Sequence, residues 1–317
     1  KLMTAYVVFS AIRDRKISEE QTLPVSLRAW DERKAGGSLM FIEPRNTPKV
    51  SDLLRGMIVN SGNDASVALA EGVAGSLPAF VDMMNRQAQA FGLKNTSFKN
   101  VTGLTEPGHH STARDLAVIA SRIIKDFPEF YPIYSTKKYR YEGAPASNEN
   151  NRNVLLSRDP TVDGMKTGYT EAAGYCLIAS AQRDFPNGKR RLLSVVLGTA
   201  SREARAAESQ KLLNWGYSAF ESIRLFDKGQ AIATLKISLG LSCNYECEYC
   251  SQRFVPRAVE TNPGDVQAFI DGLDAWVTSP PEKVEFWGGE PLVYIKTMRS
   301  LAEAIKAKFP KADLSVI

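Results

Sequence analysis

Residues 163–169 read Asp-Gly-Met-Lys-Thr-Gly-Tyr, and the fold of the chain turns on them. Upstream of them apolar residues recur at helical spacing. From about residue 161 the pattern changes to short β-prone runs at 164–169, 175–181 and 191–197. The turn-rich residues 184–188 separate the last two runs. We therefore predict an antiparallel meander, whose first strand carries Lys166-Thr167-Gly168.

Helical patterns surround this meander. Several upstream segments have apolar residues at helical spacing, and one more begins after the capping residue Thr112. The upstream segments are 1–13, 48–59, 65–73 and 77–91. A last helix is expected from about residue 202 to 223. The sequence thus predicts an α+β domain that is helical first and rich in strands afterwards.

A second short motif, Ser61-Gly62-Asn63, lies in the tight connection between two of these helices. Enzymes that transfer acyl groups through a serine use Ser-x-Asn on a loop and Lys-Thr-Gly on a strand. They also need a lysine that takes the proton of the nucleophilic serine. Each three-residue match is weak by itself. Their order, their wide separation and their settings together favour this chemistry.

The sequence segments around both motifs resemble a known family more closely. They are Lys1-Leu2-Met3-Thr4 and residues 58–65, 92–96, 163–170 and 172–176. Through them residues 1 to about 230 resemble the low-molecular-weight D-alanyl-D-alanine carboxypeptidases, penicillin-binding proteins that trim peptidoglycan stem peptides. For residues 1–234 the resemblance implies a β-lactamase/transpeptidase-like α+β domain that lacks its first strands. It also implies that no cofactor is needed and that the domain belongs in the periplasm or cell envelope.

The resemblance further implies catalytic roles. Lys1 would be the general base, Ser61 a proton relay to the leaving D-alanine, and Asn63 a ligand for the substrate backbone. The nucleophilic serine of the family comes three residues before this lysine and is absent from the sequence. We therefore expect the domain to be inactive as it stands, because removal of a nucleophile abolishes most of the rate enhancement. It would bind β-lactams and stem peptides that end in D-Ala-D-Ala noncovalently at most.

Substrate-binding roles follow from the same resemblance. Lys166 would attract the terminal carboxylate of the peptide, Thr167 would supply a hydroxyl beside it, and Gly168 would complete the strand motif. Arg205, in the helix after the meander, would reinforce this anion site.

Other residues with reactive side chains receive no role. Cys176 lies in an apolar run and is expected to be a buried core residue. His109 and His110 precede a helix cap, match no catalytic position of the family and are expected to face solvent. The Ser-x-x-Lys that starts at Ser135 follows the Ser-x-Asn motif instead of preceding it, and we reject it as a catalytic pair.

Composition bounds the class of protein. With 317 residues, 44% of them hydrophobic and 24% charged, the chain suits two globular domains. It contains no apolar run of the roughly 18 residues that a transmembrane helix needs. No signal peptide is visible at its start. The net charge of +5 is modest, and no nucleic-acid partner is predicted.

Downstream of about residue 235 the sequence changes character. Cys243, Cys247 and Cys250 follow an apolar strand and place three thiolates around one loop. Zinc would need a fourth ligand, which only the distant Cys176 or the two remote histidines could supply. A [4Fe-4S] cluster accepts three thiolates and leaves one iron open. That iron can chelate S-adenosylmethionine and cleave it to a radical.

The cysteine loop, including Tyr249, resembles the radical S-adenosylmethionine superfamily. The run Gly288-Gly289-Glu290 agrees, because that family uses a glycine-rich strand end to hold the cofactor. Strand and helix patterns alternate over residues 235–317 as about βαβαβ, which predicts the first part of an α/β barrel. The resemblance implies a [4Fe-4S] cluster, S-adenosylmethionine as cofactor and a cytoplasmic location for this part.

Three hypotheses stay open for the whole chain. The first is a carboxypeptidase-like domain at residues 1–234 that meets peptidoglycan peptides. The second is a radical S-adenosylmethionine enzyme fragment at residues 235–317. The third is an artificial or misassembled fusion with neither activity. Since the two chemistries belong to different compartments, the location of the whole chain also stays open.

Overall fold

The computed structural model of the chain describes residues 1–186, 188–220, 234–238, 263–273, 277, 279–287 and 295–316. The chain divides into two compact units, Lys1–Ile223 and Arg224–Ile317. Each unit has its own hydrophobic core. The first unit holds both acyl-transfer motifs.

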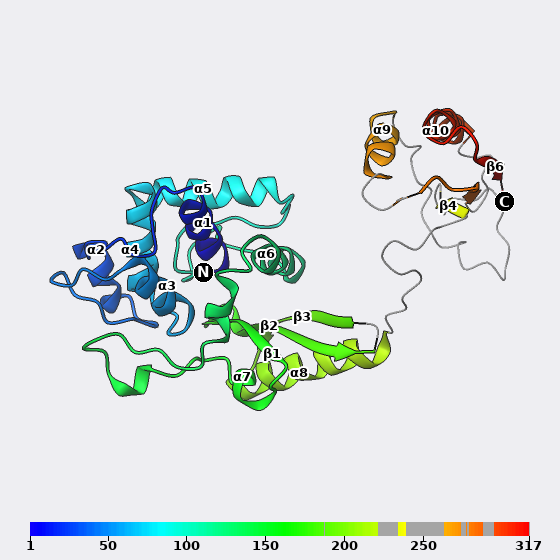
Figure 1. The fold of residues 1–317 in the computed structure, drawn as a ribbon. Coiled ribbons are helices and arrows are strands. Elements are labelled where there is room, and N and C mark those ends of the chain that lie inside the picture. Colours follow the sequence, from blue (N-terminus) through cyan, green and yellow to red (C-terminus); the bar gives the residue numbers. More distant parts are fainter. Residues whose placement is uncertain are drawn as a thin grey trace. The chain divides into compact units, whose positions relative to one another are not determined.

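The first unit begins with helices packed around α1 (Leu2–Arg13), which is buried along most of its length (Figure 1). The longer helices that follow are α3 (Val50–Ile58), α4 (Asn63–Ala74), α5 (Leu77–Ala90) and α6 (Ala113–Asp126). Short helical turns lie between the main elements: α2 (Leu27–Trp30), η1 (Asp31–Lys34), η2 (Tyr131–Ser135), η3 (Ala146–Asn148) and α7 (Leu155–Arg158). The helices predicted from apolar periodicity are confirmed to within a few residues at their ends.

Side-chain caps set where several of these helices begin. Ser26, Ser76 and Thr112 each accept a hydrogen bond from the backbone N–H three residues later. Such a bond satisfies one of the N–H groups that the first helical turn leaves without a partner. The cap predicted at Thr112 is therefore confirmed.

The predicted meander is confirmed as an antiparallel sheet in the order β1-β2-β3. Its strands are β1 (Val162–Thr170), β2 (Gly174–Phe185) and β3 (Gly188–Thr199). In the register of β1 and β2, Lys166 lies opposite Ile178 and Gly168 opposite Cys176. The Lys-Thr-Gly motif therefore lies on a strand that has only one neighbour among the described strands of this sheet.

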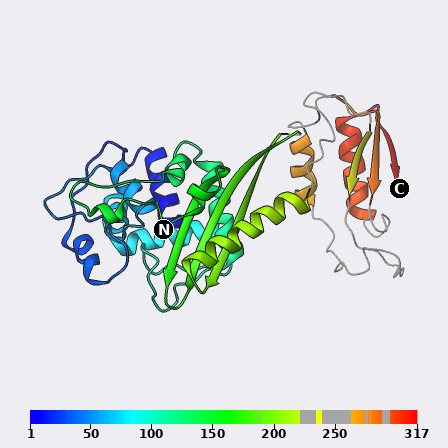
Figure 2. The same cartoon turned by 90° about the horizontal axis from the view of Figure 1, so that it is seen from below.

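Alternate residues of the sheet pack into two different cores. Leu177 and Ala179 of β2 pack with side chains of α8 (Arg202–Ala219). Ile178, between them, packs with Met165 of β1 in the core of the helical region. This period of two is the ordinary geometry of a strand that is covered on both faces. In Figure 2, α8 runs along the sheet.

In the second unit the described strands alternate with helices. The elements are β4 (Thr234–Ser238), α9 (Pro263–Gly272), β5 (Lys283–Trp287), α10 (Ile295–Lys308) and β6 (Asp313–Val316). The strands are parallel in the order β4-β5-β6, as strands joined by helical crossovers must be. The predicted βαβαβ alternation is confirmed for these residues. That it forms part of a radical S-adenosylmethionine barrel stays a prediction.

The predicted cluster and cofactor residues lie outside the described part of the chain. They are Cys243, Cys247, Tyr249, Cys250, Gly288, Gly289 and Glu290. Within the described residues, no group of three or more histidine, cysteine, aspartate or glutamate side chains is arranged to hold a metal ion.

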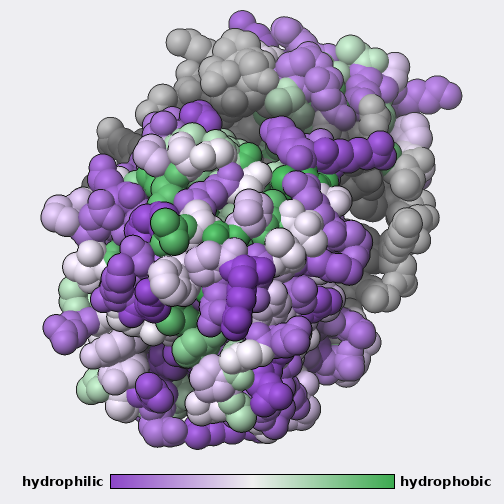
Figure 3. All heavy atoms as spheres, turned by 90° about the vertical axis from the view of Figure 1, so that its left-hand side faces the viewer, coloured by the Kyte–Doolittle hydropathy of each residue, from purple (hydrophilic) through white to green (hydrophobic). Residues whose placement is uncertain are grey.

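The face of the first unit that carries α2 and α3 is largely hydrophilic, with hydrophobic side chains scattered between polar ones (Figure 3). Among the described residues, no single helix combines the length and the hydrophobicity needed to cross a membrane. Taken together, α4 and α5 pass such a test of length and composition, but they are bent by 86° at the break between them.

Candidate active site

A cleft of about 1340 Å³ in the first unit brings together the residues singled out from the two acyl-transfer motifs. Those that line it are Lys1, Ser61, Asn63, Lys166, Thr167, Gly168 and Arg205. They come from the start of α1, the turn before α4, strand β1 and helix α8. Segments far apart in the sequence thus contribute to one concave site, which is the usual form of an active site.

The turn between α3 and α4 presents the Ser-x-Asn motif to the cleft. Ser61 has a left-handed φ of 62°, which is uncommon for a residue with a side chain. Asn63 begins α4 and is buried, and its backbone N–H donates to the carbonyl of Ser38, 2.8 Å away. The side-chain NH2 of Asn63 is also buried, but it has no hydrogen-bond partner. An unpaired buried donor is costly, so any acceptor that reaches this group would stabilise the site.

Lys1 lies beside this amide. Its Nζ donates to Oδ1 of Asn63 at 2.6 Å and to the carbonyl of Thr102 at 2.7 Å. Burial lowers the pKa of Lys1 to about 8, and the neighbouring Arg152 lowers it too, while Glu32 acts in the opposite sense. A lysine with a pKa near neutrality is partly uncharged at working pH and can accept a proton.

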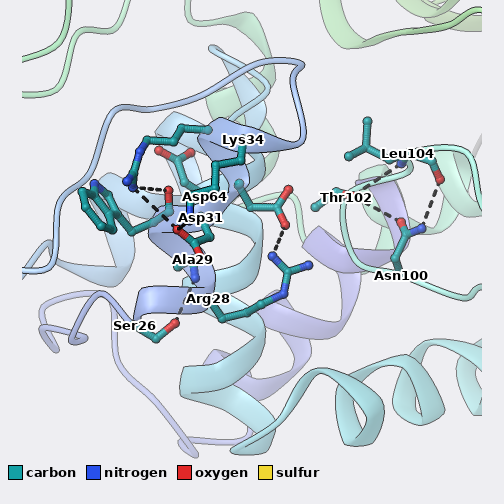
Figure 4. Close-up of polar contacts among 12 residues, drawn as sticks. Ser26, Arg28, Ala29, Asp31, Lys34, Asp64, Asn100, Thr102 and Leu104 are labelled. Carbon is teal, nitrogen blue, oxygen red and sulfur yellow. Dashed lines mark hydrogen bonds and ion pairs between the residues drawn. The ribbon is translucent and has the colours of Figure 1, made fainter.

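The carbonyl that receives Lys1 belongs to a turn closed by Asn100. Nδ2 of Asn100 donates to the carbonyl of Leu104 at 3.0 Å, and Oδ1 of Asn100 accepts from the backbone N–H of Gly103 at 2.8 Å. The hydroxyl of Thr102 reaches the same Oδ1 at 3.3 Å. Figure 4 shows Asn100, Thr102 and Leu104 joined in this way. One asparagine therefore fixes the turn whose carbonyl orients Lys1.

Lys166 of β1 faces Ser61 across the cleft. Its Nζ donates to Oγ of Ser61 and to the carbonyl of Thr167, both at 3.0 Å. Burial holds the pKa of Lys166 well below its usual value, and the positive charges of Lys1, Arg152 and Arg205 add to this. An anion placed among these cations would stabilise the charged form of Lys166 and so offset both effects. The cleft is therefore suited to a carboxylate.

Arg205 also joins the site through its contacts. It is 6% exposed, and its Nη1 donates to the carbonyl of Gly168 at 3.2 Å. Its Nη2 reaches the carbonyl of Arg152 at 3.4 Å. The guanidinium therefore fastens the end of the Lys-Thr-Gly motif to the segment before α7, and it brings a further positive charge to the cleft.

Arg152 is a site residue that the sequence analysis missed. It lines the cleft, and its guanidinium donates to Oγ of Ser38 and to Oδ1 of Asn148. Burial lowers its pKa. In the sequence it stands in the polar run Asn150-Asn151-Arg152-Asn153, where no periodicity or motif separates it from a surface arginine. Only its spatial proximity to Lys1 and Lys166 marks it.

Two expectations about unassigned side chains need correction. Cys176 was expected in the core, but it is only half-buried and lines the cleft, because Gly168 opposite it on β1 has no side chain to cover it. His109 was expected to face solvent, yet it is half-buried in the cleft wall with its ring edge against Phe98. His110 is exposed, as expected.

Comparison with known proteins agrees with this geometry. The sequence profile of the family described as D-alanyl-D-alanine carboxypeptidase matches residues 1–201. The D-alanyl-D-alanine carboxypeptidase DacA of Haemophilus influenzae is 42% identical over 240 residues, which are 76% of this chain and 60% of DacA. DacD of Escherichia coli is 43% identical over 243 residues, which are 76% of this chain and 61% of DacD. The chain thus spans about 60% of the length of these relatives.

Solved structures give the same result for the fold. Penicillin-binding protein 5 of Haemophilus influenzae superposes with a TM-score of 0.67 at 44% identity, over 73% of this chain and 66% of that one. Penicillin-binding protein D2 of Listeria monocytogenes, solved in its ampicillin-bound form, gives a TM-score of 0.59 at 32% identity. That match covers 68% of this chain and 84% of the other.

Proposed function

We propose that this chain, which belongs to the D-alanyl-D-alanine carboxypeptidase family, uses the cleft of its first unit to bind the D-Ala-D-Ala end of peptidoglycan stem peptides. The observation that carries the proposal is that Arg152, Lys166 and Arg205 line one cleft. Asn63 lines the same cleft, and its side-chain NH2 group has no hydrogen-bond partner. Cations suit the terminal carboxylate of the peptide, and the amide suits its backbone carbonyl.

The proposed reaction is serine-type hydrolysis of the terminal peptide bond. The serine that the family places three residues before Lys1 would attack the carbonyl carbon of the penultimate D-alanine and pass its proton to Nζ of Lys1. The C–N bond would then break, and Ser61 would relay a proton to the nitrogen of the leaving D-alanine. Water would hydrolyse the resulting ester. That serine lies outside residues 1–317, so the proposal is best tested by binding.

The test is a calorimetric titration of the chain with diacetyl-L-Lys-D-Ala-D-Ala. We expect binding that is lost when the C-terminal carboxylate of the peptide is amidated, and that weakens at least about tenfold in Lys166→Gln, because a charge-assisted hydrogen bond is lost. The control is Lys125→Gln, which removes the same charge from an exposed position on α6. Equal affinity for the free and amidated peptides would contradict the proposal.

The second unit supports a second candidate function, a radical S-adenosylmethionine site. The cysteine run follows β4 in the sequence, and Gly288-Gly289-Glu290 follows β5 directly. Since β4 and β5 are parallel neighbours, both motifs continue the chain from the same edge of the sheet. Ligands of parallel sheets bind at that edge. We therefore propose that this unit holds a [4Fe-4S] cluster through the three cysteines.

Anaerobic reconstitution with iron and sulfide tests this second proposal. We expect the iron content and the thiolate-to-iron absorption of the chain to fall to background in Cys247→Ser. The control is Cys176→Ser, which removes the thiol that lies in the first unit. Equal iron binding by all three proteins would exclude a cluster at these cysteines.

A further inference from the structure

The oxygen of the Asn63 carboxamide has a hydrogen-bond partner, whereas its NH2 group has none. Its Oδ1 accepts the hydrogen bond from Nζ of Lys1, and since the protonated form of Nζ only donates, the contact fixes which end of the amide is oxygen in that form. The NH2 group then points the other way, where it is buried without a partner.

Gly37 lies against this NH2 group. A Cβ built on Gly37 would stand 2.9 Å from Nδ2 of Asn63, with the next contact, to Leu104, at 3.8 Å. That distance is within the range at which a hydrogen-bond acceptor oxygen lies from a nitrogen. A methyl carbon there would both press on the amide and occupy the place of an acceptor. The φ of Gly37 is left-handed at 91°.

The loop that carries Gly37 is fastened and cannot simply move away. We call residues 36–42 the glycine loop. The carbonyl of Ser38 accepts the backbone N–H of Asn63 at 2.8 Å, and the hydroxyl of Ser38 accepts from Arg152. Further along, the Asp64 carboxylate accepts the N–H groups of Met40 and Phe41, both at 2.8 Å. If a side chain at residue 37 clashed with Asn63, the side chain of Asn63 would therefore have to move, and not the loop.

We propose that Gly37 is a positioning residue for the Asn63 carboxamide: its lack of a side chain keeps the amide oxygen on Lys1 and keeps carbon away from the side of the NH2 group from which a peptide carbonyl would approach. Asn63 is short, so its amide yields to a methyl group only by turning away from Lys1. The second half of the proposal, the contact with a peptide, rests on the proposed function. The first half concerns the protein alone.

The neighbouring Gly36 supplies a matched control. Its φ of 74° is also left-handed, so alanine at either position pays a similar backbone cost. A Cβ on Gly36 meets nothing within 4 Å, however. A difference between Gly37→Ala and Gly36→Ala therefore reports the contact with Asn63 and not the loss of glycine.

The first experiment is a double-mutant cycle on the thermal midpoint, which needs no ligand. We expect Gly37→Ala to lower the midpoint more than Gly36→Ala in the native background, and both to lower it equally when Asn63→Ala has removed the amide. Equal effects in the native background, or a difference that persists without Asn63, would overturn the proposal. Should Gly37→Ala fail to fold alone, the Asn63→Ala background still decides, because folding must then be restored there.

The second experiment measures the affinity for diacetyl-L-Lys-D-Ala-D-Ala. We expect about a tenfold loss in Gly37→Ala, the worth of one hydrogen bond, and a change of less than about twofold in Gly36→Ala. In the Asn63→Ala background, Gly37→Ala should cause no further loss. Equal losses in the two glycine variants would refute the contact with the peptide. If the native chain binds no peptide, the proposed function fails, while the thermal cycle still decides the role of Gly37.

Discussion

Replacing Asp64 by asparagine tests how the glycine loop is held over the cleft. The Asp64 carboxylate is 2% exposed and accepts four backbone N–H groups. Oδ1 receives those of Met40 and Ala65 at 2.8 and 2.9 Å. Oδ2 receives those of Phe41 and Ile42 at 2.8 and 3.2 Å. An asparagine has nearly the same shape but only one oxygen.

The expected magnitude follows from this count. One oxygen still accepts two N–H groups, while the other two face the NH2 group of the new side chain. Each unsatisfied buried donor costs about 1–3 kcal/mol, so Asp64→Asn should destabilise the first unit by about 4 kcal/mol. For a unit of this size that corresponds to a fall of about 8–16 °C in the thermal midpoint. This is a large part of the stability of an ordinary domain.

Hydrogen exchange measures the protection of the individual amides, and calorimetry measures the thermal midpoint of the first unit. Of the amides of Met40, Phe41, Ile42 and Ala65, the two that face the new NH2 group should exchange much faster in Asp64→Asn, and the thermal midpoint of the first unit should fall. The matched control is Asp82→Asn, which neutralises an exposed carboxylate on α5 and should shift neither quantity measurably. Unchanged exchange at all four amides, with a midpoint equal to that of the control, would refute the reasoning.

Three further predictions concern the cleft. Burial and neighbouring cations lower the pKa of Lys166, and a bound peptide carboxylate should raise it again, so the affinity for the peptide should fall as the pH rises above that lowered pKa. Calorimetry in buffers of different ionisation enthalpy should show proton uptake on binding. An affinity that does not change with pH would contradict this prediction. Asn100→Ala should open the turn that contains Thr102, lower the free energy of unfolding measured by chemical denaturation by about 1–3 kcal/mol, and weaken peptide binding. An unchanged free energy of unfolding would show that the turn holds without the Asn100 side chain. Arg205→Lys should weaken peptide binding about tenfold, because one ammonium lacks the forked geometry with which the guanidinium reaches both carbonyls. The exposed Arg158→Lys is the control and should bind as the native chain does; equal affinities of the two variants would refute a role for the guanidinium of Arg205.

The two motifs could be placed before the structure because their signals are local. Lys166 stands in a β-prone run, and Ser61 stands between two apolar periodic segments, so strand and turn follow from neighbouring residues. The same holds for the cap at Thr112. Cys176 was misplaced for a related reason: its apolar run correctly predicted a strand, but the run does not reveal that the residue opposite is a glycine.

Arg152 and Gly37 show what local signals leave out. Nothing near Arg152 in the sequence indicates that it lies beside Lys1 and Lys166, and nothing near Gly37 indicates the amide of Asn63. Both relations join segments that are distant along the chain. Periodicity and short motifs carry no information about such distances.

By itself, the sequence determined the order of helices and strands, the α+β character of the first unit and the alternation in the second. It also determined which residues form the two short motifs, since side-chain chemistry and periodicity are properties of a residue and its neighbours. The tertiary structure alone decided the environment of those residues. Burial and crowding of like charges lower the pKa of Lys1 and Lys166, and close packing sets Gly37 against Asn63. These effects depend on which distant segments exclude water together, and that is settled only when the chain has folded.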